Sequence, residues 1–242
     1  MFLVVKRRTL VAAALALTVL TVGALRFLSA ARPAFAPAAP RAARTFVIDA
    51  GHGGEDGGAV AADGTAESAI NLAVAVRLEA LLALLGEDTA MTRREDVSIY
   101  SDGAATLRQK KTSDLRNRAA LVRGTPNAVL VSVHQNSLPG VPSVRGAQVF
   151  YGREAAGEAL AAAVQAALNK AINTGNEKQA KQIDPSIYLM KHADCPAILV
   201  ECGFLSNAQE AALLQTPAHQ TRLAVAVAAG ILSADPQGRE GS

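Results

Sequence analysis

A glycine-rich loop carrying a histidine follows the first strand-like segment of the chain. The apolar residues Phe46–Ile48 lead into Asp49, and five glycines stand between positions 51 and 58 around His52. Apolar β-forming residues bounded by glycine are typical of a buried strand. Glycine lets the backbone turn tightly, and open α/β sheets bind their ligands at the carboxyl ends of strands. Taken alone, the pattern is equally typical of a tight turn with a packed histidine.

Two later segments repeat the pattern of a buried strand that ends in a functional side chain. Residues 128–133 (Ala-Val-Leu-Val-Ser-Val) lead to His134, and residues 197–200 (Ala-Ile-Leu-Val) lead to Glu201. Ionisable groups are costly to bury unless they are paired. Packing of the core therefore does not explain why three strands end in such groups. Histidine and carboxylate candidates without a cysteine cluster favour a catalytic zinc site over a structural one.

A catalytic zinc ion needs a third protein ligand besides His52 and His134. Glu67 is our candidate, because it follows the glycine-rich loop and opens a segment, 67–85, whose apolar residues recur at helical spacing. An acid in the first turn of a helix is also favoured by the helix dipole and needs no metal. Position alone leaves both interpretations of Glu67 open.

These segments, in this order, resemble the zinc-dependent N-acetylmuramoyl-L-alanine amidases of the Amidase_3 family. The family pattern is Asp-Pro-Gly-His-Gly-Gly after a strand, a glutamate that opens the next helix, Ser-x-His-x-Asn, and Pro-Ala-x-Leu-Val-Glu-x-Gly-Phe-Leu-Ser-Asn. The chain carries these motifs at Asp49–Gly54, Glu67, Ser132–Asn136 and Pro196–Asn207. Ala50 replaces the proline of the first motif, and Cys202 is a small apolar residue in the last, most specific one. The resemblance spans about residues 45–233.

The resemblance implies a Zn²⁺ cofactor held by His52, Glu67 and His134, with Glu201 as the catalytic acid–base. It implies hydrolysis of the amide bond between N-acetylmuramic acid and the L-alanine of the peptidoglycan stem peptide. All four side chains are present in this chain. The resemblance therefore predicts an active enzyme, and a zinc carboxypeptidase is a weaker alternative because the last motif is typical of the amidases.

Three further residues are weaker candidates for the surroundings of the metal or for substrate contact. Asp49 is placed either to orient a ligand histidine or to cap the glycine-rich loop. Arg93 follows the second predicted strand and is expected to be solvated, with contact to a substrate carboxylate as the alternative. Asn136 is the last residue of the Ser-x-His-x-Asn motif.

Within the family, the chain is most similar to the spore-cortex, germination-specific amidases, which have a short hydrophobic amino-terminal segment and a bare catalytic domain. This similarity implies removal of stem peptides, so that a separate muramoyl deacetylase can complete muramic-δ-lactam. It also implies that the enzyme acts in the space between the forespore membranes. An activator protein is a candidate partner. The alternatives are a general vegetative autolysin and a wall-binding regulator without catalysis, which the four intact positions disfavour.

The first 31 residues have the features of a targeting segment. Basic residues at positions 6–8 precede an uncharged run, Thr9–Leu25, which is typical of a signal peptide and is at the lower length limit for a membrane anchor. We favour an uncleaved anchor, which would place the protein outside the cytoplasm and attach it to the membrane; the alternative is secretion. The expected divisions are targeting segment 1–31, Ala/Pro/Arg-rich linker 32–44, catalytic domain 45–235 and polar tail 236–242.

The predicted catalytic domain alternates strands with helices. Strands are expected at 46–49, 87–91, 128–133, 147–151 and 197–201, and helices at 67–85, 114–123, 154–172 and 217–232; 173–186 is expected to be a loop. This alternation predicts a single three-layer α/β domain, with a mostly parallel twisted sheet and helices on both faces. The net charge is +3 and part of the basic excess precedes the domain, so nucleic acid is not an expected partner.

Two cysteines, Cys195 and Cys202, bracket the last predicted strand. Extended chain of that length separates their Cα atoms by about 20 Å, whereas a disulfide spans at most about 7 Å. Both are therefore predicted to be free thiols, with an intermolecular link as the alternative for an exposed cysteine.

Overall fold

The computed structural model describes residues 44–234 and, outside that range, Thr21. Apart from Thr21, the predicted targeting segment (1–31) lies outside the described residues, as do nearly all of the predicted linker (32–44) and the polar tail (236–242). Among the helices that are described, none is long and apolar enough to cross a membrane.

A six-stranded sheet forms the centre of the domain, in the order β2-β1-β3-β6-β4-β5. The strands are β1 (Thr45–Ala50), β2 (Asp88–Met91), β3 (Ala128–Asn136), β4 (Gln148–Tyr151), β5 (Lys181–Gln182) and β6 (Ala197–Phe204). Strands β2, β1, β3 and β6 run parallel, whereas β4 pairs antiparallel with β6 and β5 runs parallel to β4. The sheet is therefore mostly parallel, as predicted.

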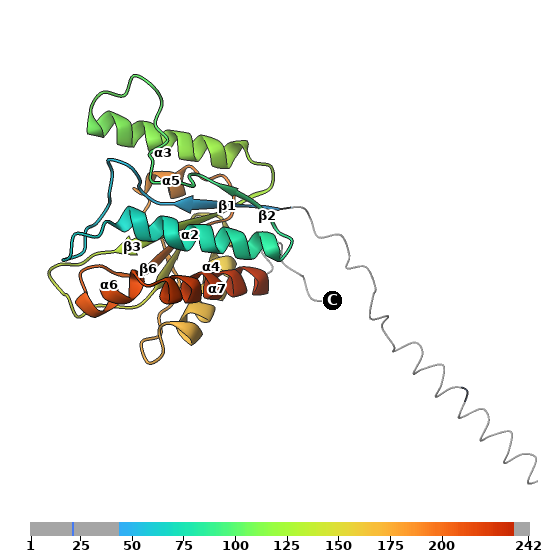
Figure 1. Cartoon of the computed structure of the whole chain (residues 1–242). Coiled ribbons are helices and arrows are strands. Elements are labelled where there is room, and N and C mark those ends of the chain that lie inside the picture. Colours follow the sequence, from blue (N-terminus) through green and yellow to red (C-terminus); the bar gives the residue numbers. More distant parts are fainter. Residues whose placement is uncertain (1–20, 22–43, 235–242) are drawn as a thin grey trace, which may run out of the picture. The chain divides into compact units, whose positions relative to one another are not determined.

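Helices cover both faces of this sheet (Figure 1). The described helices are α2 (Glu67–Leu84), α3 (Leu107–Gly124), α4 (Ala155–Ala171), α5 (Tyr188–Lys191), α6 (Ala208–Leu214) and α7 (Pro217–Ser233). Helices α2, α4 and α7 pack together on one face, and α3 and α5 lie on the other. The predicted three-layer α/β domain is confirmed.

Strand β1 shows how the sequence divides the core between the two faces. Phe46 and Ile48 belong to the apolar cluster under α2, α4 and α7, whereas Val47 belongs to the cluster under α3 and α5. All three side chains are fully buried, and each such side chain contributes about 1.5–3 kcal/mol relative to exposure. Because side chains alternate along a strand, Asp49 falls on the same face as Val47, towards α3.

The observed helices differ from the predicted ones at the start of α3, and the short helices α5 and α6 were not predicted. The apolar pattern predicts a helix from 114, but α3 begins at Leu107. Thr106 and Gln109 form a capping box, in which Gln109 N donates to Thr106 Oγ1 (3.2 Å) and Thr106 N donates to Gln109 Oε1 (3.0 Å). Apart from the exposed Leu107, the first two turns of α3 are polar, so apolar periodicity does not detect them.

The segment after α4 also differs in part from prediction. Within 173–186, predicted as a loop, Lys181 and Gln182 form the two-residue strand β5 beside β4. No helix carries the chain from β3 to β4, so β4 begins at the edge where β3 ends and runs in the opposite direction to β6.

Both cysteines are free, as predicted. Burial raises the pKa of Cys195 to about 11 and that of Cys202 to about 12. Neither thiol is therefore a reactive thiolate at neutral pH.

Candidate metal centre and active site

Three side chains from separate parts of the chain converge at one edge of the sheet. His52 lies in the loop after β1, Glu67 is the first residue of α2, and His134 lies near the end of β3. Each offers a ligand atom, and these atoms all lie within 4.8 Å of one another. The structure thus brings together the three residues that the sequence analysis selected as metal ligands.

The sheet order explains the convergence. Strands β1 and β3 are parallel neighbours, with Ala50 paired to Val133, so the loop after β1 and the end of β3 meet at the same edge. Strand β6 is the other neighbour of β3, and Glu201 is the register partner of His134. The fourth predicted functional side chain therefore belongs to the same edge.

His52 is held in an unusual backbone conformation by its loop. Its φ is 60°, in the left-handed region that non-glycine residues rarely adopt. Its ring nitrogen Nδ1 lies 3.0 Å from Asp56 Oδ2, and Nε2 lies 3.4 Å from Glu67 Oε2. The pKa of Asp56 is lowered, chiefly by the hydrogen bond with His52. Asp56 thus orients the ring and keeps Nε2 towards Glu67, as carboxylates commonly do for metal-binding histidines.

Glu67 is almost fully buried, yet its carboxylate is well supplied with hydrogen-bond donors. Oε2 accepts from the main-chain N–H of Ala59 (2.9 Å), and Oε1 accepts from the N–H of Gln135 (3.0 Å) and from Asn71 Nδ2 (3.1 Å). Burial acts to raise the pKa of Glu67, but the hydrogen bond and charge of His134, with help from His52, outweigh it and hold the pKa at about 2. Glu67 is therefore ionised, which is the state that binds a metal.

His134 completes the group. Its Nδ1 lies 2.9 Å from Glu67 Oε1, and its ring meets that of His52 edge to face, with 5.1 Å between centroids. Burial acts to lower the pKa of His134, but the hydrogen bond with Glu67 and the nearby carboxylates raise it overall. Gly51 is required here, because a Cβ at that position would overlap the imidazole ring of His134.

Glu201 differs from Glu67 in having an unsatisfied oxygen. Its Oε2 is buried and has no hydrogen-bond partner among the described residues. Burial raises the pKa of Glu201 to about 7, against the attraction of His134. A buried acceptor without a partner marks a place where a ligand or water is expected, and a carboxyl group with a pKa near 7 is suited to general acid–base work.

The donor set fits zinc. Two imidazoles and one carboxylate are a common protein complement for catalytic zinc, which keeps a further position for water or substrate. The described cluster supplies these three donors, and the unsatisfied Glu201 oxygen lies on the strand next to His134. His52, Glu67 and His134 could therefore hold a metal ion with Glu201 beside it.

Two of the three weaker candidates, Arg93 and Asp49, have other environments than predicted. Arg93 is neither solvated nor available to substrate, because its side chain is completely buried and donates to main-chain carbonyls. Asp49 bonds to no histidine ring and does not cap the loop; it accepts from Arg118 Nη1 (2.7 Å), Ser132 Oγ (2.6 Å) and Thr92 Oγ1 (2.8 Å). Asn136 is half-buried at the end of β3, and its main-chain carbonyl accepts from Leu205 N (2.8 Å).

Sequence reasoning did not identify two residues that support the site. Asp56 orients His52, and the fully buried Arg118 donates from Nη2 to the carbonyl of His52 (2.7 Å). Asp56 lies four residues after His52 in a loop of irregular backbone. Sequence spacing in such a loop does not show which way a side chain points. Arg118 is separated from His52 by 66 positions, and only its place on the buried side of α3 could have pointed to it.

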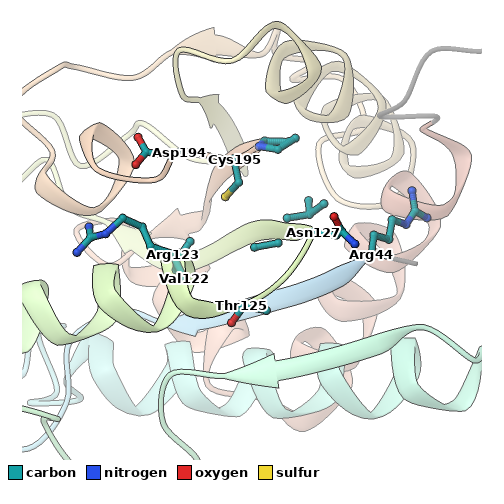
Figure 2. Close-up of a pocket in the computed structure, with 10 residues that line it drawn as sticks. Arg44, Val122, Arg123, Thr125, Asn127, Asp194 and Cys195 are labelled. Carbon is teal, nitrogen blue, oxygen red and sulfur yellow. The ribbon is translucent and has the colours of Figure 1, made fainter. Parts of the chain in front are cut away.

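A cavity of about 470 Å³ lies elsewhere, at the amino ends of the parallel strands (Figure 2). Arg44 precedes β1 and Pro196 precedes β6, and both line it, together with Arg123, Asp194 and Cys195. The cluster around His52 lies at the opposite, carboxyl end of these strands. The cavity therefore has no part in the candidate metal centre.

Comparison with known proteins establishes the class. Residues 46–233 match the family described as N-acetylmuramoyl-L-alanine amidase. The chain is 34% identical over 193 residues to the germination-specific N-acetylmuramoyl-L-alanine amidase of Bacillus subtilis (strain 168), covering 80% of this chain and 80% of that protein. The chain therefore belongs to the N-acetylmuramoyl-L-alanine amidase family, Amidase_3. It is an enzyme, a hydrolase of peptidoglycan.

Solved structures agree in fold. The CwlD amidase from Clostridioides difficile, in complex with the GerS lipoprotein, is 35% identical with a TM-score of 0.75, covering 78% of this chain and 96% of that one. The N-acetylmuramoyl-L-alanine amidase from Clostridium difficile 630 is 27% identical with a TM-score of 0.69, covering 79% of this chain and 96% of that one.

Proposed function

We propose that this amidase is zinc-dependent, with His52, Glu67 and His134 as metal ligands and Glu201 as the catalytic acid–base. The observation that carries the proposal is the cluster of three ligand atoms within 4.8 Å, beside a buried glutamate oxygen that has no partner. The scissile bond is the amide between the lactyl group of N-acetylmuramic acid and the L-alanine of the stem peptide.

The protein side chains divide the work. Zinc, when bound, supplies Lewis-acid activation of the scissile carbonyl. Glu201 takes a proton from the attacking water and delivers it to the departing amine nitrogen, which is worth about 10²–10⁴ in rate. Asp56 keeps the proton of His52 on Nδ1, so that Nε2 faces the cluster with its lone pair. Glu67 stays ionised throughout, since its pKa is about 2.

We further propose a role in the spore cortex, where removal of stem peptides prepares muramic acid for a separate deacetylase that completes muramic-δ-lactam. Support comes from the 34% and 35% identities to a germination-specific amidase and to CwlD. An extracytoplasmic site follows from the location of peptidoglycan, with the membrane reached through the amino-terminal segment. The CwlD structure includes the lipoprotein GerS, so we propose a lipoprotein activator as a partner of this chain too.

The catalytic proposal is tested with the full-length chain, loaded with zinc and added to purified peptidoglycan. Mass spectrometry should detect free stem peptides with a new L-alanine amino terminus. Glu201→Gln should reduce their release by about 10²–10⁴-fold while zinc content stays stoichiometric. Equal release by the variant would show that Glu201 does not act as the acid–base. If neither protein releases stem peptides although zinc is bound, the assay is repeated with the proposed lipoprotein activator. Absence of release with the activator present would contradict the catalytic proposal.

The cortex proposal is tested in the source organism. Deletion of the gene should remove muramic-δ-lactam from the muropeptides of purified spores and leave vegetative autolysis unchanged. Lactam at its normal level, together with slowed vegetative autolysis, would instead support a general autolysin.

A further inference from the structure

Two consecutive arginines after β2 have opposite environments. Arg94 is exposed, and its Nη2 pairs with Glu79 Oε1 at 2.8 Å. The side chain of Arg93 is completely buried, and its ion pair among the described residues is long: Nη1 lies 4.0 Å from Asp96, a residue whose own side chain is largely exposed. Burying a cation without a close carboxylate is expensive, so its other contacts must account for its place in the fold.

Those contacts are main-chain carbonyls: Nη1 donates to Glu95 O (2.9 Å), and the other three lie beside two of the proposed metal ligands. Nε donates to Ala50 O (2.9 Å), and Nη2 donates both to Gly51 O (3.1 Å) and to Ser68 O (2.8 Å). Gly51 directly precedes His52, and Ser68 directly follows Glu67. A single guanidinium nitrogen therefore joins the backbone of the loop that carries His52 to the first turn of the helix that carries Glu67.

The loop needs such a constraint. His52 has a φ of 60°, a strained conformation for a non-glycine residue, which persists only when the surroundings enforce it. Gly53 packs against this side chain, because a Cβ there would overlap Val97 O and would also come within 2.9 Å of Arg93 Nε. Lysine could not make all of these contacts at once, because its three N–H donors share one nitrogen, whereas the guanidinium donates to Ala50 O, Glu95 O and the Gly51–Ser68 pair from three separate nitrogens.

We propose that Arg93 is a positioning residue for the metal centre, which sets the spacing of His52 and Glu67 by holding the carbonyls of Gly51 and Ser68 with one nitrogen. This inference rests on the proposed zinc site. It assigns Arg93 a role through the two ligands rather than through contact with substrate.

The test compares Arg93→Lys with Arg94→Lys in the full-length chain. Zinc affinity is measured by competition with a chelator, and ligand geometry by the visible absorption spectrum of the Co²⁺-substituted protein. We expect Arg93→Lys to bind zinc about 10–100-fold more weakly, to show an altered Co²⁺ spectrum and to lose kcat with little change in KM. Arg94→Lys, which changes the neighbouring exposed arginine, should match the parent in all three.

The reciprocal measurement needs no variant and remains available if Arg93→Lys does not fold. Zinc should slow hydrogen exchange at Arg93 Nε in the parent protein and leave exchange at Arg94 unchanged, because coupling between two sites is mutual. Unchanged exchange, or a folded Arg93→Lys with parental zinc affinity and Co²⁺ spectrum, would overturn the inference. Failure of the parent protein itself to bind zinc would instead refute the proposed function.

Discussion

Two groups of buried charges lie next to each other in this enzyme, and they differ in how completely they are paired. The arginine network, on the α3 side, consists of Arg118, Asp49 and Asp114. Arg118 bonds both carboxylates at 2.7 Å and two main-chain carbonyls at 2.7 Å. The ligand cluster of His52, Glu67 and His134 has Glu201 beside it, whose Oε2 is unsatisfied.

The difference separates support from chemistry. A network whose donors and acceptors are satisfied is rigid and has no capacity for a further ligand. The unsatisfied carboxylate of Glu201 can still bind a further ligand. Its pKa is raised because burial destabilises the ionised form. We infer that the arginine network holds the loop of His52 in place, while the ligand cluster and Glu201 act on metal and substrate. Four measurements can break or sharpen this division.

The largest effect is expected from removal of a ligand. His134→Ala should abolish stoichiometric zinc binding and reduce hydrolysis to background, because two donors remain where catalytic zinc takes three. Zinc content after dialysis and stem-peptide release are the measurements. His219→Ala, in α7 and outside the cluster, is the matched control. Full zinc content in His134→Ala would remove this residue from the metal centre.

A loss of stability comes next. Arg118→Met should destabilise the fold by about 3–5 kcal/mol, since Asp49 and Asp114 would remain buried without their cation. Urea unfolding of the metal-free protein measures the change. Arg116→Met alters an exposed residue of the same helix and should stay within about 0.5 kcal/mol of the parent. A small change at Arg118 would mean that the network is not a structural support.

The pH dependence of stability tests the unsatisfied glutamate. The folded pKa of Glu201, about 7, lies above its ordinary value of 4.5. The folded state therefore holds a proton that the unfolded chain has lost, and stability decreases as the pH rises from about 4.5 through 7. Glu201→Gln removes this loss, so the metal-free variant should gain up to about 3 kcal/mol on the parent between pH 4.5 and pH 8. If the free energies of unfolding of parent and variant changed in parallel with pH, burial would not raise the pKa of Glu201.

The smallest effect is expected at the orienting carboxylate. Asp56→Asn should weaken zinc binding by about 10–100-fold, because His52 Nδ1 loses a charged acceptor. Chelator competition measures the affinity. Glu55→Gln changes the adjacent carboxylate, which pairs with Lys110 at the surface, and should bind zinc as the parent does.

The sequence predicted the fold class and most elements because their signals are local. The apolar run in β1 spans a few residues and the apolar spacing in α2 spans a few helical turns. Both elements form as expected. The first turns of α3 were missed because its residues there are polar. The ligand candidates were found because motifs of fixed order place His52 and His134 after or near the ends of strands and Glu67 at the start of a helix, and the sheet brings these points together.

The roles of the charged residues could not be predicted in this way. Arg93 and Arg94 are adjacent and chemically identical in sequence, yet one is buried and one exposed. Asp49 precedes the loop of His52 but pairs with Arg118, 69 positions away. The sequence determined the α/β architecture, the family and the four candidate side chains, since strand and motif patterns act over short distances. Only the tertiary structure decided which charges support the site, because burial and pairing depend on partners that folding brings from distant parts of the chain.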